Sequence, residues 1–367
     1  NSLVSRYMDL IASAKIHFHG EELNLSLLGK YLTGADRTVR REALMASEGW
    51  FQDATEQIDE IFDQLVKNRT AQAHALGYEN FVSMGYDRMS RNCYDQEMVR
   101  VFRDQVKRSL VPFVDRLQRR RAARIGVDRL ELWDEGVYFP QGNPVPAGTP
   151  EEILAAGQRM YREMSPETRE FMDFMMDNAL FDVLGRKNKR AGGYMTYLPD
   201  YKSPFIFANF NGTSGDADVI THECGHAFQG YLTRNEEIRE FTDLGMETAE
   251  IHSMAMEFFT EPWMDLIFGE RAPDYVRMHL EDAASFIPYG CMVDEFQHIV
   301  YQQPGLTPAQ RKEAWTQLQA QYKPYLNYGD TPFYGHGGFW QKQQHIFCDP
   351  FYYIDYCLAQ TVSLEFW

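Results

Sequence analysis

The strongest constraint on the fold of this 367-residue chain is a long helical repeat of apolar residues across positions 36–76. Apolar side chains recur there every three or four residues with charged residues between them, as in an amphipathic helix. The repeat predicts one long helix, or two helices broken near Gly49. A second helical stretch covers 96–125, and Pro112 should kink it because proline lacks a backbone N–H and crowds the preceding turn.

Three further helix starts carry a capping residue followed by proline. Thr149 and Thr307 each have a Glu or Gln three residues later, the pattern of a capping box, and Ser165 gives a weaker version. The Pro- and Gly-rich loop 139–148 predicts a boundary between a helical lobe at 1–148 and a second, catalytic lobe at 149–367.

The helical pattern is interrupted in the segment 186–212. Two short aromatic stretches, 193–197 and 204–210, have the composition of β-strands, and 198–203 would form the turn between them. We therefore expect a mainly α protein with a small antiparallel sheet at 193–210. The residues 213–216 that follow should begin the next helix.

Composition restricts the partners of the chain. The 53 acidic residues outnumber the 36 basic ones, for a formal charge of −17, which argues against nucleic acid or an anionic membrane as a partner. No apolar stretch approaches the length of a membrane span. Five cysteines without a CxxC pair predict free thiols in a reducing compartment, so we expect a cytoplasmic protein. Oligomeric state cannot be read from these features.

The helix predicted after 213–216 contains the sequence His222-Glu223-Cys224-Gly225-His226. Residues four apart share one face of a helix, so both imidazoles can bind a single zinc ion. Glu223 projects beside them and can accept a proton from the attacking water. The alternative is a pair of histidines satisfied by ordinary hydrogen bonds. Cys224 points away from the shared face and is not expected to be a ligand.

A catalytic zinc needs a third protein ligand, and an acidic face on the next helical segment offers one. Glu250 and Glu257 lie seven residues apart in a segment otherwise rich in Met and Phe. A carboxylate among apolar neighbours is costly unless it is paired or binds metal. We expect Glu250 to be the ligand and Glu257 to support it, with Glu257 as the replacement if Glu250 is not. His252 points elsewhere on the helix and is expected to be structural.

A third group of polar aromatic residues lies near the end of the chain. Tyr353 and Tyr356 are three residues apart, so both hydroxyls can face one cavity, and His345 precedes them. Such aromatic runs are more often part of a core than of an active site. The glycine-rich loop 334–338 comes just before this group.

These motifs together resemble the zinc peptidases of the oligoendopeptidase F and thimet oligopeptidase family, and the oligoendopeptidase F branch in particular. The resemblance rests on the sequence His-Glu-Cys-Gly-His, on Glu250 in its helix, on the segment 204–213 and on the closing segment 345–356. It extends through nearly the whole chain. The family pattern also includes a helical segment before a start like Asn1 and residues after Trp367.

The resemblance implies a multi-helix, two-lobed, zincin-like fold with a deep channel and one zinc ion at its floor. It implies that His222, His226 and Glu250 are the zinc ligands and that Glu223 is the general base. It further implies that the group of His345, Tyr356 and Tyr353 contacts substrate and stabilises the oxyanion, with Tyr352 as an alternative to Tyr353.

We therefore predict a zinc-dependent endopeptidase that hydrolyses internal bonds of short oligopeptides. An extended substrate would add to the edge of the small sheet, where Gly192, Gly193 and Tyr194 let its backbone approach closely. The alternatives are a peptidyl-dipeptidase or carboxypeptidase on the same scaffold, which would need a cation for the substrate's terminal carboxylate. A further alternative is a peptide-binding protein without catalysis, against which the intact Glu223 argues.

Overall fold

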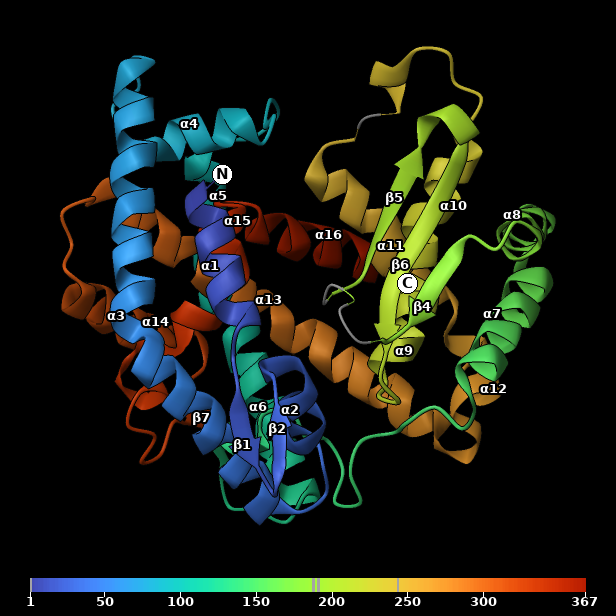
Figure 1. The fold of residues 1–367 in the computed structure, drawn as a ribbon, viewed down its shortest axis with the longest axis horizontal. Helices are drawn as coiled ribbons and strands as arrows, with labels where there is room; N and C mark the ends of the chain where they lie inside the picture. Colours follow the sequence, from blue (N-terminus) through green and yellow to red (C-terminus); the bar gives the residue numbers. More distant parts are fainter. Residues whose placement is uncertain (1, 187–188, 190–191, 243) are drawn as a thin grey trace. The chain divides into compact units, whose positions relative to one another are not determined.

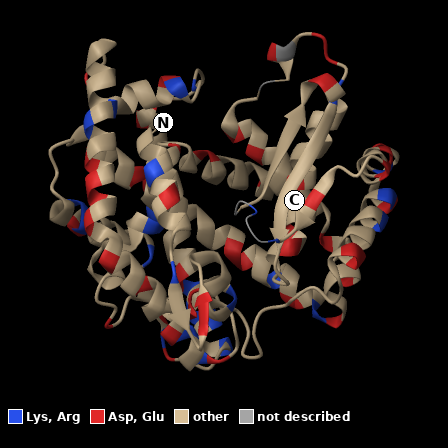
Figure 2. Ribbon diagram, in the orientation of Figure 1, with Lys and Arg blue, Asp and Glu red and all other residues tan. Residues whose placement is uncertain are grey.

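The computed structural model describes residues 2–186, 189, 192–242 and 244–367. The chain is mainly α-helical, which confirms the predicted fold class (Figure 1). It forms two compact units. The first contains residues 1–142 and 281–357, and the second contains 143–280 and 358–367. Acidic side chains are spread through the helices of both units, in keeping with the negative charge of the chain (Figure 2).

The first unit is built from helices around one long helix, with two small pairs of strands. Its strands are β1 (Ile16–Phe18) and β2 (Glu21–Leu23), which pair antiparallel, and β3 (Leu130–Glu131) and β7 (Leu326–Asn327), which pair parallel. Its helices are α1 (Ser2–Ala12), α2 (Leu25–Leu32), α3 (Arg37–Ala75), α4 (Phe81–Arg88), α5 (Gln96–Gln105), α6 (Val111–Arg124), α14 (Pro308–Tyr322) and α15 (Gln344–Cys348).

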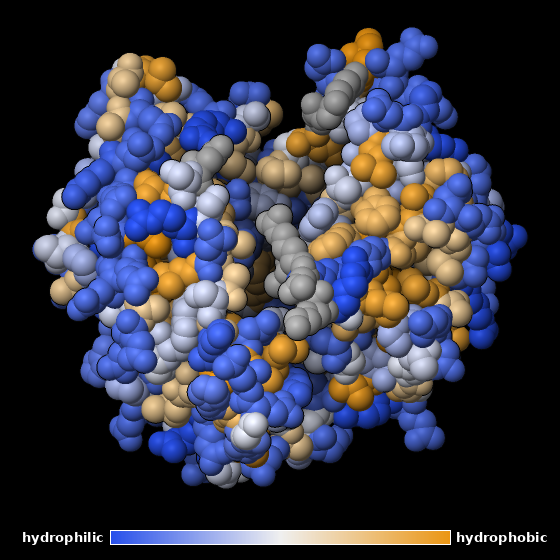
Figure 3. All heavy atoms as spheres, viewed as in Figure 1, coloured by the Kyte–Doolittle hydropathy of each residue, from blue (hydrophilic) through white to orange (hydrophobic). Residues whose placement is uncertain are grey.

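Helix α3 confirms the long helical repeat and continues through Gly49 without a break. Its buried face packs on aromatic residues from the end of the chain: the Phe62 ring centroid lies 4.7 Å from that of Trp340 and 5.1 Å from that of Phe347. Burying one such side chain contributes about 1.5–3 kcal/mol to the free energy of unfolding, so this face of α3 stabilises the first unit. The opposite side of α3 carries mainly hydrophilic side chains (Figure 3).

The proline predicted to kink the second helical stretch is accommodated by a change of helix type. A single π-helical turn, Val106–Leu110, separates α5 from α6, and Pro112 occupies the first turn of α6. The first turn of a helix tolerates proline because its N–H groups have no partner within the helix. The π turn thus lets the chain remain helical across Pro112.

The second unit combines helices with one three-stranded sheet. Its helices are α7 (Pro150–Met164), α8 (Pro166–Asp177), α9 (Gly215–Asp218), α10 (Cys224–Leu232), α11 (Met246–Phe259) and α12 (Asp265–Phe268). Its strands are β4 (Phe181–Leu184), β5 (Tyr194–Leu198) and β6 (Ser203–Phe210). Thr149 forms the predicted capping box with Glu152 at the start of α7, and Ser165 caps α8.

The sheet contains the predicted antiparallel pair and one strand that the sequence pattern missed. Strands β5 and β6 pair antiparallel, with Tyr194 opposite Phe207. Strand β4 adds parallel to the other side of β6, so the order is β4-β6-β5 and β5 is an edge strand. Four residues directly after a helix show too little alternation to predict β4.

The grouping of the chain differs from the predicted division into 1–148 and 149–367. The chain passes from the first unit to the second after Gly142, close to the predicted boundary. Residues 281–357, however, belong to the first unit again. The chain crosses between the units at two further points, which lie inside the helices α13 (Ala272–Gln302) and α16 (Tyr353–Phe366). A boundary inside a helix leaves no loop or composition signal, because the apolar pattern continues through it. None of the described helices has the length and apolar character needed to cross a membrane.

Candidate functional site

The His-Glu-Cys-Gly-His segment lies where two helices of the second unit approach closely. A π-helical turn, Val219–Glu223, leads into α10, and α10 packs against α11 and against the sheet. A Cβ atom on Gly225 would lie 2.6 Å from the Cα of Ser253, so only glycine fits between the two backbones. This close approach brings the histidines of one helix against the carboxylates of the next.

Three side chains from these helices form a group that can hold a metal ion. Glu250 Oε2 lies 3.3 Å from His222 Nε2 and 3.5 Å from His226 Nε2. One ligand atom from each residue lies within 4.8 Å of the others. The two imidazoles are four residues apart, with ring centroids 4.9 Å apart. Two histidine nitrogens and one carboxylate oxygen form a ligand set typical of catalytic zinc.

The electrostatics of the group keep the ligand carboxylate ionised. Burial by itself would raise the pKa of Glu250, whose exposed fraction is 4%. Hydrogen bonds and charges from His222 and His226 outweigh this effect and hold the pKa below its usual range. Without a positive partner this buried carboxylate would be destabilising, so the two imidazoles, or a cation between them, are required.

A second carboxylate orients the first histidine. Glu257 Oε1 lies 2.6 Å from His222 Nδ1, and Glu257 Oε2 lies 2.7 Å from His279 Nε2. These two imidazoles lower the pKa of Glu257 to about 2 against the opposing effect of burial. A carboxylate on Nδ1 leaves Nε2 of His222 to face a metal ion, an arrangement common around bound zinc. Sequence analysis predicted the supporting position of Glu257 but gave no signal for His279, which comes from α13.

The second histidine has its own neighbour on α11. His226 Nδ1 lies 3.3 Å from His252 Nε2, so one ring donates to the other. Burial and the nearby His226 lower the pKa of His252 to about 4. His252 therefore belongs to the surroundings of the metal group, which its place on the helical wheel did not reveal, because the wheel shows no neighbouring helix.

Glu223 and Cys224, which lie between the two histidines in the sequence, have different surroundings. Glu223 ends the π-helical turn and is half-buried. Cys224 is fully buried, and burial raises the pKa of its thiol. Among the described residues, the group able to hold a metal consists of His222, His226 and Glu250.

The predicted group of polar aromatic residues forms in the first unit. The ring centroid of His345 lies 4.8 Å from that of Tyr353 and 5.9 Å from that of Tyr356. Tyr352 is also adjacent, with its centroid 6.0 Å from His345 and 4.8 Å from Tyr356. All three tyrosines are half-buried. The rings of these four residues thus lie together, and Tyr353 and Tyr356 are the pair for which the three-residue spacing predicted proximity.

Buried contacts fix this aromatic group. Asp355, at the start of α16, accepts a hydrogen bond from Arg91 at 2.7 Å and another from Tyr94 at 3.0 Å. Gln343 Nε2 donates a hydrogen bond to His345 Nδ1 at 2.9 Å. Because Nδ1 accepts this bond, a neutral His345 carries its proton on Nε2. Burial raises the pKa of Tyr353, so its hydroxyl stays protonated and can donate.

The residues predicted to bind substrate lie at the start of the edge strand. Gly192 has a φ of +99°, a conformation that glycine adopts without strain, and Gly193 follows it directly before β5. The Tyr194 ring stacks on Phe207 of β6 with centroids 5.1 Å apart. The far side of β5 has no strand partner among the described residues, so its backbone groups can pair with an added strand.

Comparison with known proteins identifies the family of the chain. The model of peptidase family M3 matches residues 31–143 and 168–367, so the chain belongs to that family. A solved structure of PZ peptidase A, with an inhibitor, is 50% identical over the whole chain with a TM-score of 0.96. A protein from Bacillus anthracis assigned as an oligoendopeptidase F is 48% identical over the whole chain, with a TM-score of 0.88.

A curated relative, the group B oligopeptidase PepB of Streptococcus agalactiae, is 24% identical over 252 residues, or 68% of this chain. The chain spans 65% of PZ peptidase A, 63% of the Bacillus anthracis protein and 41% of PepB. The resemblance inferred from the motifs is thereby confirmed at the level of the family.

The close approach of α10 and α11 predicts that Gly225→Ala will destabilise the second unit. The added methyl group must displace backbone atoms of α11, which we expect to cost about 1–3 kcal/mol. Gly230→Ala is the matched control on α10, because its Cβ would meet Tyr197 only at 3.4 Å. Urea unfolding followed by circular dichroism compares the two. Equal stability of the two variants would contradict the predicted close contact.

Proposed function

We propose that this chain is a zinc-dependent endopeptidase that hydrolyses internal bonds of short oligopeptides. The observation that carries the proposal is the group of His222, His226 and Glu250, with Glu223 beside it. Membership of peptidase family M3 supports peptide hydrolysis as the reaction. The names of the relatives, oligoendopeptidase and oligopeptidase, support short peptides as the substrate class.

The residues present fit zinc as the metal. They offer two imidazole nitrogens and one carboxylate, and the His222 ring is already oriented by Glu257. Three protein ligands leave a position for water or substrate, as a catalytic zinc site requires. When bound, zinc supplies a Lewis acid that polarises a carbonyl oxygen and makes water acidic near neutral pH.

In the proposed mechanism Glu223 is the residue that moves protons. Its carboxylate accepts a proton from the water that attacks the scissile carbonyl. The same group then gives that proton to the departing amine as the C–N bond breaks, so that the carboxylate of Glu223 is regenerated. The new carboxyl group and the new amine are released, and near neutral pH they become carboxylate and ammonium. The half-buried position of Glu223 supports this role.

We further propose that the aromatic group of the first unit stabilises the oxyanion and positions substrate. Tyr356 is the first choice as the hydroxyl donor, with Tyr353 or Tyr352 as the alternatives. His345 presents a protonated Nε2 as a second donor, because Gln343 engages its Nδ1. A donor aimed at the developing negative charge stabilises the transition state more than the ground state.

The peptide is proposed to bind as an added antiparallel strand on β5. Main-chain hydrogen bonds to an edge strand recognise any extended peptide, which suits broad sequence tolerance. Gly192 and Gly193 present no side chain that would keep a peptide backbone away. The cytoplasm stays the predicted location, and the five free cysteines fit a reducing compartment.

We expect about one zinc ion per chain, bound by His222, His226 and Glu250. Glu250→Ala should remove stoichiometric zinc, and Glu257→Gln should weaken zinc binding by about 10–100-fold through loss of orientation of His222. Glu247→Ala, on the same helix but outside the metal group, is the control. The measurement is metal analysis after dialysis against graded chelator. Unchanged zinc affinity in Glu250→Ala would show that another residue is the third ligand.

The central test of the function uses Glu223→Gln and an internally quenched peptide blocked at both ends. The parent protein should cleave this peptide, because an endopeptidase needs neither terminus. The variant should keep its zinc and stability but lose roughly 10²–10⁴-fold in kcat, because an amide cannot accept the proton. Cleavage of unblocked peptides alone would instead favour a carboxypeptidase or peptidyl-dipeptidase. Zinc binding without turnover of any peptide would indicate a peptide-binding protein.

The role of the tyrosine hydroxyl predicts a loss of turnover in Tyr356→Phe. The change removes one oxygen atom, so zinc content and stability should stay the same while kcat falls by roughly 10²–10³-fold. Steady-state kinetics of Tyr356→Phe, Tyr353→Phe and Tyr352→Phe compare the three hydroxyls. A rise in KM with little change in kcat for Tyr356→Phe would assign it to substrate binding instead.

Strand addition predicts protection of the edge strand when substrate binds. With Glu223→Gln and an uncleaved peptide, amide hydrogens of β5 that face away from β6 should exchange more slowly, because they gain hydrogen-bond partners. Hydrogen exchange followed by mass spectrometry measures this, with β4 as the internal control on the other edge of the sheet. Protection confined to segments other than 192–198 would contradict the proposed mode of binding.

A further inference from the structure

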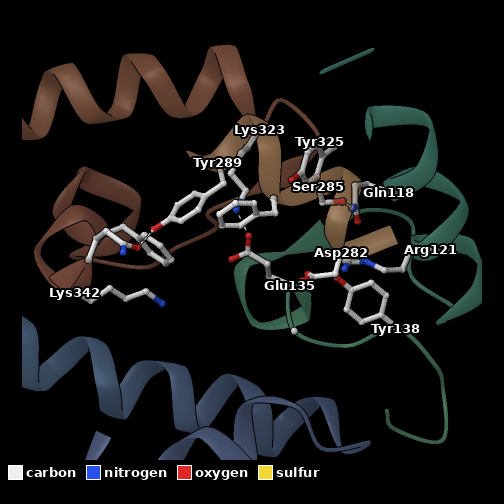
Figure 4. A pocket seen from close by; sticks show the side chains of 14 residues that line it. Gln118, Arg121, Glu135, Tyr138, Asp282, Ser285, Tyr289, Lys323, Tyr325 and Lys342 are labelled. Atoms are coloured by element: carbon white, nitrogen blue, oxygen red, sulfur yellow. Dashed lines mark hydrogen bonds and ion pairs between the residues drawn. The ribbon is translucent and has the colours of Figure 1, made fainter. Parts of the chain in front are cut away.

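The first unit contains a polar cavity that the proposed mechanism does not use. Its volume is about 390 Å³, within the usual range for a site that takes a small ligand. Residues from α6, α13 and the segments 135–138 and 323–343 line it (Figure 4). Aromatic rings, including Tyr289 and Phe339, form part of the wall.

The charges around the cavity are unusual for this acidic chain. Three cations, Arg121, Lys323 and Lys342, line it against two carboxylates, Glu135 and Asp282. By formal charge the wall has one basic group more than it has carboxylates, although burial lowers the pKa of Lys323 to about 7. An excess of basic groups in a cavity wall attracts anionic groups of small ligands.

Most of these charged groups already have partners. Lys323 bonds to Glu135, and the Tyr138 hydroxyl donates to Asp282 at 2.8 Å. The Arg121 guanidinium lies over the Tyr138 ring at 4.6 Å. Glu135 is thus paired with a cation, whereas Asp282 keeps its negative charge beside Arg121 and Tyr138.

The remaining cation is Lys342, in the turn Gly338–Lys342. Its ammonium lies 4.0 Å from the centre of the Phe339 ring, and among the described residues it forms no ion pair. Lys342 lines the cavity and is exposed to solvent. Nearby protein atoms disfavour its charged form and lower the pKa of Lys342 to about 8. An anion beside the ammonium would offset this cost.

Hydrogen bonds connect this cavity to the aromatic group of the same unit. The Tyr289 hydroxyl donates to Gln343 Oε1 at 2.6 Å, and Gln343 Nε2 donates to His345 Nδ1 at 2.9 Å. Gln343 therefore belongs to the cavity wall and also contacts His345, a member of the group proposed to contact substrate. A ligand in the cavity would lie next to residues that the proposed function assigns to the peptide.

We propose that this cavity binds the C-terminal carboxylate of a peptide, with Lys342 as its counter-ion. The aromatic wall covers the last side chain of the peptide. The identification of a peptide as the ligand rests on the proposed function, whereas the recognition of a carboxylate rests on the cavity alone. An ammonium paired to a carboxylate gives a charge-assisted hydrogen bond, the stronger kind in proteins.

The test measures binding rather than hydrolysis, by isothermal titration of the full chain with N-acetyl-Ala-Phe and with its C-terminal amide. We expect the acid to bind about tenfold more tightly than the amide. Lys342→Met should remove this preference, and Lys342→Arg should retain it. Lys67→Met, an exposed lysine of α3, is the matched control and should also retain it. Lys342→Gln replaces the Met variant if that protein does not fold.

Two results would overturn the proposal. One is equal binding of the acid and the amide to the parent protein. The other is an acid preference that survives in Lys342→Met, which would mean that the carboxylate binds elsewhere, for example at the metal ligands. The amide of N-acetyl-Asp-Phe separates a terminal from a side-chain carboxylate, and binding as tight as that of the acid would overturn the assignment to a chain terminus. Because no bond is broken, a failure of the proposed peptidase function would leave these results interpretable.

Discussion

The arrangement of the metal group depends on the carboxylate of Glu257, which two histidines from different helices share. It holds His222 by Nδ1 and His279 by Nε2, and both contacts are shorter than 3 Å. A buried carboxylate is stable only when its charge is matched, and these imidazoles match it. The pKa of His279 rises to about 10 for the same reason: burial opposes its charge, but the neighbouring carboxylates Glu257 and Glu261 outweigh burial. The charged network thus fixes the ring orientation that a metal ion needs.

The aromatic group of the first unit is held by a comparable buried charge. Asp355 lies between Tyr353 and Tyr356 in the sequence but points to Arg91, so the ion pair sets the rotation of the first turn of α16. The close packing of α13 and α16 adds a steric constraint, since a Cβ on Gly290 would collide with the Cys357 sulfur. Each unit therefore positions its polar side chains by one buried ion pair and one glycine contact between helices.

Much of this could be predicted from the sequence because it depends on local spacing. The four-residue spacing of His222 and His226 and the long repeat of α3 are properties of a single helix, so periodicity is enough to find them. The antiparallel pair β5–β6 followed from two aromatic stretches separated by a short turn. His279 and His252 were missed as neighbours of the metal group, because their partners lie on other helices and no spacing rule relates them.

The sequence by itself indicated the family and the helical class, and it predicted the residues of the metal group and of the aromatic group, because these follow from motifs within single helices or from their order. Only the tertiary structure decided that residues 281–357 join the first unit, that β5 is an edge strand, and that Glu257 serves two histidines. The same is true of the cavity around Lys342, whose wall combines α6 with segments about 200 residues later. The physical reason is that burial and charge pairing depend on which surfaces meet, and a local pattern specifies only the surface of one element.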